Sequence, residues 1–171
     1  MLPRPDATEH DPYYARYVAQ VPAGDIVRLL AGQLDDTVRL LSAVPADRET
    51  YRYAPGKWSI REVVGHMIDT ERVFTSRAHW FARQGGGALP SMDQEPWAAA
   101  SNAGDRPLAD LLAEFRAVRA ATVALFASFD DEIGGRRGVA SGVEFTVRSL
   151  AWITAGHERH HQAVLRREYG L

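Results

Sequence analysis

Four stretches of this chain repeat their apolar residues at helical spacing, and segments rich in proline and glycine separate them. Apolar residues three or four positions apart lie on one face of a helix, so each stretch would bury one face. Four such helices of roughly 20 residues, with no strand pattern between them, predict an all-α fold, a four-helix bundle. The predicted helices run from Asp25 to before Pro45, from about Ser59 to Gln84, from Asp105 or Arg106 to Phe129, and from Thr146 to about Glu168.

Residue types that favour helix ends support these boundaries. Ser59-Ile60-Arg61-Glu62 is a capping box, in which the serine and the glutamate each satisfy a free amide at a helix start. Gly85-Gly86-Gly87 then ends the second helix. We expect long connections between the second and third helices and between the third and fourth, at about 85–106 and 130–146. A short extended piece around Val143–Phe145 fits within the later connection.

The length of 171 residues suits a single domain, 1–171, with one good core. Residues 1–22 would form its N-terminal arm, and four prolines there argue against an early helix. Tyr13, Tyr14 and Tyr17 are candidates for a lid or belt on the body, although an ordered arm without that function also accounts for them.

Composition excludes several classes of function. The formal net charge of -2 gives no electrostatic case for a nucleic-acid partner. No apolar run reaches the roughly 18 residues that span a bilayer, and the first residues lack an apolar signal core. We therefore expect a soluble, cytoplasmic protein that binds no membrane. With 0 cysteines the chain has no side-chain thiol, so any thiol chemistry needs a thiol brought in from outside.

Three of the 6 histidines lie in the run Gly156-His157-Glu158-Arg159-His160-His161. His157 and His161 are four residues apart, so on a helix they share one face. Literally the run matches H-E-x-x-H, two zinc ligands with a glutamate base. The zinc peptidases with this motif take a third ligand downstream, but few residues follow His161, and Arg167 occupies the position of the expected histidine.

His66 is the better candidate for a third ligand, because of its depth in the bundle. It lies seven residues into the second helix, and His161 and His157 lie at a similar depth from the end of the fourth. If those helices run antiparallel, all three imidazoles sit about 10 Å in from one rim. Hydrogen-bonded core histidines remain the alternative. We expect His160 to lie beside the ligands without being one of them. The residues expected on the surface are His10, His79, Asp69 and Glu71.

The residues from Tyr53 to His66 resemble the second-helix entry of the DinB-like superfamily, and the run Gly156–His161 resembles its fourth-helix motif. This resemblance covers the chain from about Asp25 onward. It implies a bundle in up-down-down-up order and a divalent metal, usually zinc or nickel, held by His66, His157 and His161. Characterised relatives include thiol S-transferases that use bacillithiol or mycothiol, and a mycothiol-dependent isomerase.

The expected function is that of a metal-dependent enzyme, a thiol S-transferase or a related transferase or hydrolase acting on a small molecule. An open metal position lowers the pKa of a bound water or thiol for attack on an electrophile. Glu158 and His160 are the candidate proton acceptors. The alternatives are a non-catalytic metal-binding or stress-related bundle, as a homodimer, and an H-E-x-x-H metalloprotease, which would require a strand-containing domain.

Overall fold

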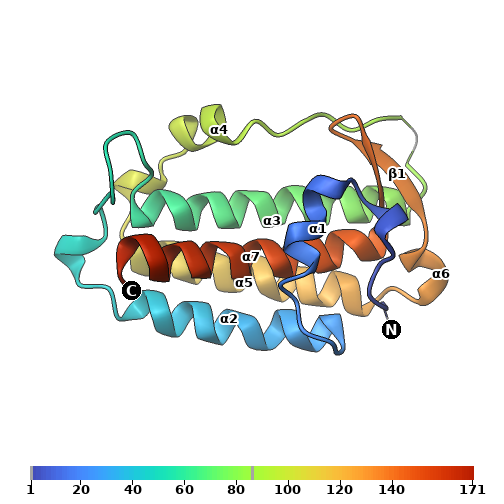
Figure 1. The fold of residues 1–171 in the computed structure, drawn as a ribbon, viewed down its shortest axis with the longest axis horizontal. Helices are drawn as coiled ribbons and strands as arrows, with labels where there is room; N and C mark the ends of the chain where they lie inside the picture. The colour runs from blue at the N-terminus through green and yellow to red at the C-terminus, as the bar shows by residue number, and fades with distance from the viewer. Residues whose placement is uncertain (1, 86) are drawn as a thin grey trace.

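Four long helices form the body of the molecule and lie side by side in the computed structural model, which describes residues 2–85 and 87–171 (Figure 1). Each one packs against two others: α3 contacts α5 and α7, and α2 contacts the same two helices from the other side. This arrangement confirms the predicted bundle. The long helices are α2 (Ile26–Ser42), α3 (Ile60–Ala82), α5 (Leu108–Ala127) and α7 (Val147–Tyr169).

The helix ends follow from the capping residues. The Asp25 side chain accepts a hydrogen bond from the Val27 amide at 2.9 Å and starts α2. Ser59 and Glu62 form the predicted capping box of α3, and Thr146 begins α7 in the same way with Ser149. Gly170 ends α7 in the left-handed conformation, with φ of 69°, which glycine adopts without strain.

A buried polar layer crosses the middle of the bundle, and all four long helices contribute to it. Arg119 of α5 donates to the Glu71 carboxylate of α3 at 2.8 and 2.7 Å and to Glu158 of α7 at 2.7 Å. Gln33 of α2 also donates to Glu158. None of these four side chains is more than 4% exposed. The prediction that Glu71 is solvated was therefore wrong: Arg119 pairs with it inside the core.

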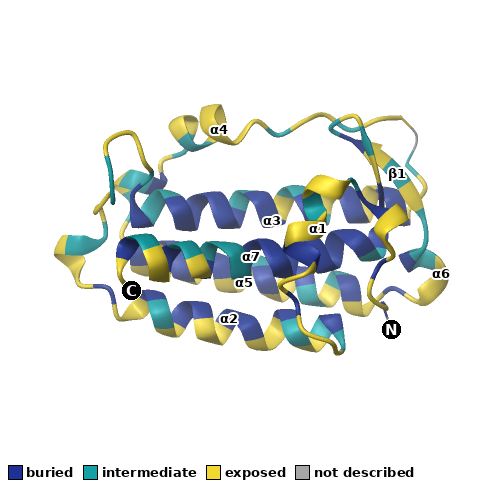
Figure 2. Cartoon of the chain, viewed as in Figure 1, coloured by how far each residue is buried: buried dark blue, intermediate teal, exposed yellow. Residues whose placement is uncertain are grey.

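Two apolar cores lie on either side of this polar layer. One surrounds Phe74 and Trp152 at the end of the bundle where α7 begins. The other surrounds Ile60 and Phe115 at the end where α7 finishes. Buried residues follow the inner faces of the long helices and exposed residues the outer faces (Figure 2). Within the described residues, no helix is both long enough and apolar enough to cross a membrane.

The connections contain more regular structure than the sequence indicated. A hairpin precedes α7, so the fold is mostly helical rather than all-α. Its tight turn uses Ser141 and Gly142, both with positive φ, which matches the twist of the paired strands. The short elements are η1 (Ala7–Glu9), α1 (Pro12–Val18), η2 (Ala46–Arg48), α4 (Gln94–Ala100), η3 (Ala103–Asp105), α6 (Asp131–Gly134), β1 (Arg137–Ala140) and β2 (Val143–Thr146).

The N-terminal arm includes α1, although its prolines argued against an early helix. Asp11 caps this helix and Pro12 occupies its first position, where the missing amide hydrogen has no cost. Helix α1, which contains Tyr17, packs across α7 (Figure 1). Gly156 permits this contact, because a Cβ at that position would lie 2.1 Å from the Tyr17 carbonyl oxygen. The glycine at the start of the histidine run thus serves helix packing.

Candidate metal centre

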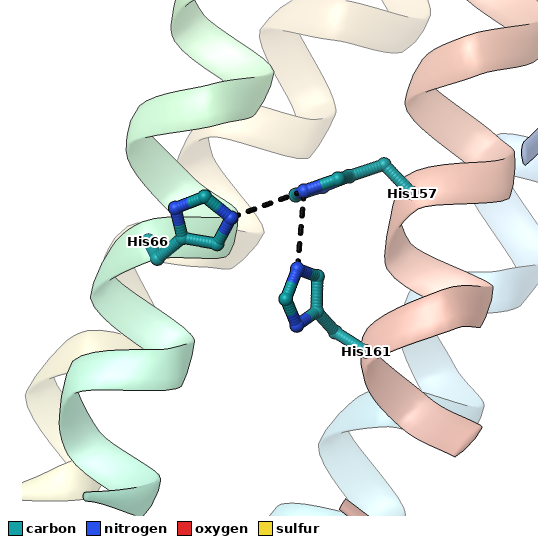
Figure 3. A group of neighbouring side chains, drawn as sticks. All are labelled: His66, His157 and His161. Atoms are coloured by element: carbon teal, nitrogen blue, oxygen red, sulfur yellow. Dashed lines mark hydrogen bonds between the residues drawn. The ribbon is translucent and has the colours of Figure 1, made fainter. Parts of the chain in front are cut away.

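His66, His157 and His161 come together between α3 and α7 (Figure 3). His157 and His161 are one turn apart on α7, and His66 approaches from α3. The Nε2 atom of His157 lies 3.1 Å from Nε2 of His66 and 3.1 Å from Nε2 of His161. One atom from each residue can be chosen so that all three lie within 4.8 Å of one another. The structure thus brings together the three residues that the depth argument selected.

The geometry of this triad fits a divalent metal ion. Zinc binds histidine nitrogen at about 2.0–2.1 Å, so a tetrahedral ion holds its ligand nitrogens roughly 3.3–3.4 Å apart. The two separations that involve His157, both 3.1 Å, are close to that value. Hydrogen bonding explains the cluster less well, because Nε2 of a neutral imidazole offers either one N–H or one lone pair and cannot form a good hydrogen bond with two neighbours at once. Three neutral ring nitrogens gathered within 4.8 Å suit a cation.

Burial keeps these histidines neutral. It is the main cause that lowers the pKa of His66 to about 4, with a smaller contribution from His160. Burial, followed by the neighbouring histidines, holds the pKa values of His157 and His161 well below the ordinary range. All three imidazoles are therefore unprotonated at neutral pH, and a neutral imidazole is the form that binds metal.

Surrounding side chains fix the orientation of the rings. The Thr70 hydroxyl lies 3.4 Å from Nδ1 of His66, at the long end of hydrogen bonding. The Trp58 ring lies 4.8 Å from the His66 ring, and the Tyr17 ring meets the edge of His157 at 5.5 Å. Such outer contacts set ring orientation and tune the basicity of metal ligands.

A cavity of about 460 Å³ opens beside the triad, and His66 and His157 form part of its wall. This volume is in the range of pockets that bind small molecules. Tyr13, Tyr14 and Tyr17 of the arm line one side, as do residues from the connection that follows α3. The tyrosines that the sequence suggested as a belt therefore border the cavity.

The two predicted proton acceptors occupy different surroundings. Glu158 points into the polar layer, where its carboxylate accepts from Arg119, Gln33 and Thr37. His160 is partly buried, and its ring lies 5.5 Å from Tyr17 and 5.2 Å from His161. His79 is exposed as expected, whereas His10, also predicted on the surface, is buried at 8% exposure.

Sequence reasoning missed Arg77, a buried residue that lines the same cavity. A signal for it was present. Arg77 follows His66 by eleven residues, and eleven steps of 100° return to within about 20° of the same helix face. The row also contains Thr70 and Val73, which line the cavity too.

The fold and the convergent imidazoles define a helical bundle with a candidate three-histidine metal centre. The sequence pattern of the DinB superfamily matches residues 29–165, and the chain belongs to that superfamily. This match confirms the resemblance seen in the sequence. Among curated proteins, none matches the chain.

Three solved structures resemble this fold. YfiT from Bacillus subtilis, described as a probable metal-dependent hydrolase with an unusual four-helix bundle topology, has a TM-score of 0.73 at 17% identity over 88% of this chain and 93% of its own. The mycothiol-dependent maleylpyruvate isomerase has a TM-score of 0.68 at 13% identity, over 85% of this chain and 61% of its own. YjoA, a DinB-like protein from Bacillus subtilis, has a TM-score of 0.60 at 22% identity over 86% and 93%. At these identities the likeness establishes a shared fold.

Proposed function

We propose that this chain is a metal-dependent enzyme that acts on a small molecule, with zinc or nickel held by His66, His157 and His161. One observation carries the proposal: three neutral imidazoles bring one ring nitrogen each within 4.8 Å of one another beside a cavity of about 460 Å³. The description of YfiT as a probable metal-dependent hydrolase supports it.

A divalent ion with three neutral ligands keeps its full charge, and when bound it supplies Lewis acidity that lowers the pKa of a thiol or a water. The side chains of the protein bind the ion and shape the site around it. The histidines present lone pairs, Tyr17 and Trp58 hold two of the rings in place, and the tyrosines of the arm shield one side of the cavity.

The more specific proposal is thiol S-transfer, in which a low-molecular-weight thiol is the co-substrate: it loses its proton to solvent, and its sulfur bonds to carbon of an electrophilic small molecule and displaces that molecule's leaving group. The chain has 0 cysteines, so none of its own side chains competes as a thiolate ligand. One structure with this fold is named a mycothiol-dependent isomerase, which makes a thiol co-substrate a reasonable expectation. Hydrolysis by an activated water uses the same centre and is the second candidate.

A panel of thiols tests the transferase proposal. Glutathione, mycothiol, bacillithiol and coenzyme A would each be assayed with monochlorobimane, using protein loaded with zinc or nickel and protein stripped of metal. We expect one thiol to give a metal-dependent rate that the His66→Ala variant loses. His79→Ala is the matched control, because His79 is an exposed histidine on the same helix. If no thiol gives such a rate, transfer is refuted and hydrolysis or a non-catalytic metal-binding role replaces it.

A metalloprotease is the weakest alternative. In that mechanism the glutamate of H-E-x-x-H acts as a base beside the metal. Glu158 instead accepts hydrogen bonds from Arg119, Gln33 and Thr37 inside the polar layer. We expect this engagement to hold the carboxylate away from the reacting water.

The proposal extends to the architecture. We propose an up-down-down-up order within a single domain, 1–171, that assembles as a homodimer. The colour gradient supports the order: α2 and α7 run in one direction and α3 and α5 in the other (Figure 1). Antiparallel α3 and α7 bring residues near the start of one helix level with residues near the end of the other, as the triad requires.

A further inference from the structure

Arg77 is a buried cation on the wall of the cavity that contains the triad. Its side chain is 4% exposed, and it follows His66 on the same face of α3. Its Nη2 atom donates to the carbonyl oxygen of Pro90 at 2.9 Å and to the Ser141 hydroxyl at 2.9 Å. These bonds tie the connection after α3 and the hairpin turn to the helix.

The charge of Arg77 has no counterpart in the part of the chain that the structure describes, since no carboxylate oxygen lies within 4.0 Å of it. Buried charges are normally paired, and the other deeply buried arginine, Arg119, contacts two carboxylates. Asp93 lines the same cavity but is exposed and caps α4. Burial lowers the pKa of Arg77 and Tyr14 partly offsets this, yet arginine stays protonated at neutral pH.

The guanidinium of Arg77 also has hydrogen-bond donors that these contacts do not use. It carries five N–H groups. Pro90 and Ser141 use two of them, and Tyr14 accounts for at most one more. Because both bonds use Nη2, at least two of the N–H groups on Nε and Nη1 remain, and each can donate a charge-assisted hydrogen bond to a carboxylate oxygen.

We infer that Arg77 binds a carboxylate of the molecule that enters this cavity, so that the substrate or its thiol partner is an organic acid. The inference rests on the proposed function for the metal end of the cavity. Eleven residues of helix separate the Cα atoms of His66 and Arg77 by about 16 Å. The ligand that reaches both is therefore elongated, with its reactive group at the histidines and its carboxylate at the arginine.

Two binding experiments test this inference without measuring catalysis. In the first, protein loaded with Co²⁺ is titrated with mercaptoalkanoates of increasing chain length and with the uncharged mercaptoalkanols of the same lengths. Binding of sulfur to the metal is followed by the change in visible absorption. In the second, metal-free protein is titrated calorimetrically with adipate and with neutral adipamide. The first experiment reports a carboxylate on the thiol, and the second reports one on a ligand without a thiol.

We expect the acid to bind about 10- to 100-fold more tightly than its neutral analogue in at least one experiment, as charged hydrogen bonds allow. Arg77→Gln should abolish this preference and leave metal content unchanged. Arg72→Gln, at an exposed arginine on the same helix, should keep it. Ser141→Gly removes one of the tying bonds but keeps the cation, and glycine accepts the positive φ of that position. This variant should also keep the preference.

The possible outcomes distinguish carboxylate binding by Arg77 from thiol transfer at the metal. Equal binding of acids and neutral analogues in both experiments would overturn the role of Arg77. So would a Ser141→Gly variant that loses the preference for the acid as fully as Arg77→Gln does, because the arginine would then only tie segments together. A preference for adipate without any thiol-dependent change in the Co²⁺ spectrum would support Arg77 and count against thiol transfer.

Discussion

The contact between α1 and α7 depends on the absence of a side chain at Gly156. A Cβ placed there would lie 2.1 Å from the oxygen and 2.4 Å from the carbonyl carbon of Tyr17. Real Cβ atoms approach no closer than about 3.0 Å, so Gly156→Ala has to move the two helices apart by roughly 1 Å. Since both obstructing atoms belong to the backbone, no side-chain rotation can relieve the clash.

Overpacking of this kind costs about 1–3 kcal/mol of the free energy of unfolding. For a chain of this length, 1 kcal/mol corresponds to about 2–4 °C in Tm, so we expect a fall of about 2–12 °C. Detachment of the arm would limit the loss and expose the bond after Arg16 to trypsin. The assay combines thermal unfolding with limited trypsin digestion.

Gly32→Ala is the matched control for this variant. Gly32 is an exposed glycine in α2, and a Cβ there meets nothing within 4 Å. The substitution should raise the stability by about 0.5–1 kcal/mol, because alanine loses less backbone entropy than glycine on folding. If Gly156→Ala were as stable as Gly32→Ala and its arm equally resistant to trypsin, the close helix contact would be refuted.

Two further predictions concern the interior, and a third concerns activity. Arg119→Met should lower the free energy of unfolding in urea by about 3–5 kcal/mol, because it leaves Glu71 and Glu158 buried without a cation; unchanged stability would contradict the polar layer. In metal-free protein, the free energy of unfolding should be highest above pH about 6.5 and fall towards pH 4, because His66 takes up a proton in the unfolded chain but, with a pKa of about 4, not in the folded one. This group alone accounts for about 3 kcal/mol. A free energy of unfolding that stays constant over that pH range would exclude the shift. Metal-loaded protein should leave a peptide library intact, and metal-dependent cleavage would reinstate the protease.

The long helices could be predicted because their signals are local. Apolar spacing, the Ser59 and Thr146 caps and the glycines after α3 lie within a few residues of the features that they control. The N-terminal helix was missed because prolines were counted as breakers, although Pro12 after Asp11 is itself a helix-start signal. The hairpin was anticipated only as a short extended piece, because a strand of four residues carries little periodic pattern.

The site shows the same division between local and distant signals. The triad could be proposed because His157 and His161 are one turn apart on α7 and His66 has a matching depth on α3. Together, this spacing and this depth predict the contact without the structure. Glu71 could not be placed, because its partner Arg119 lies 48 residues away on another helix. A helical wheel gives the direction of a side chain but not what lies opposite it.

X-ray absorption at the metal edge of the purified protein tests whether His66, His157 and His161 hold a metal ion. We predict about one divalent metal per chain, bound by three imidazole nitrogens at roughly 2.0–2.2 Å, one of which is lost in His66→Ala. A protein without stoichiometric metal, or a metal shell that His66→Ala leaves unchanged, would contradict it.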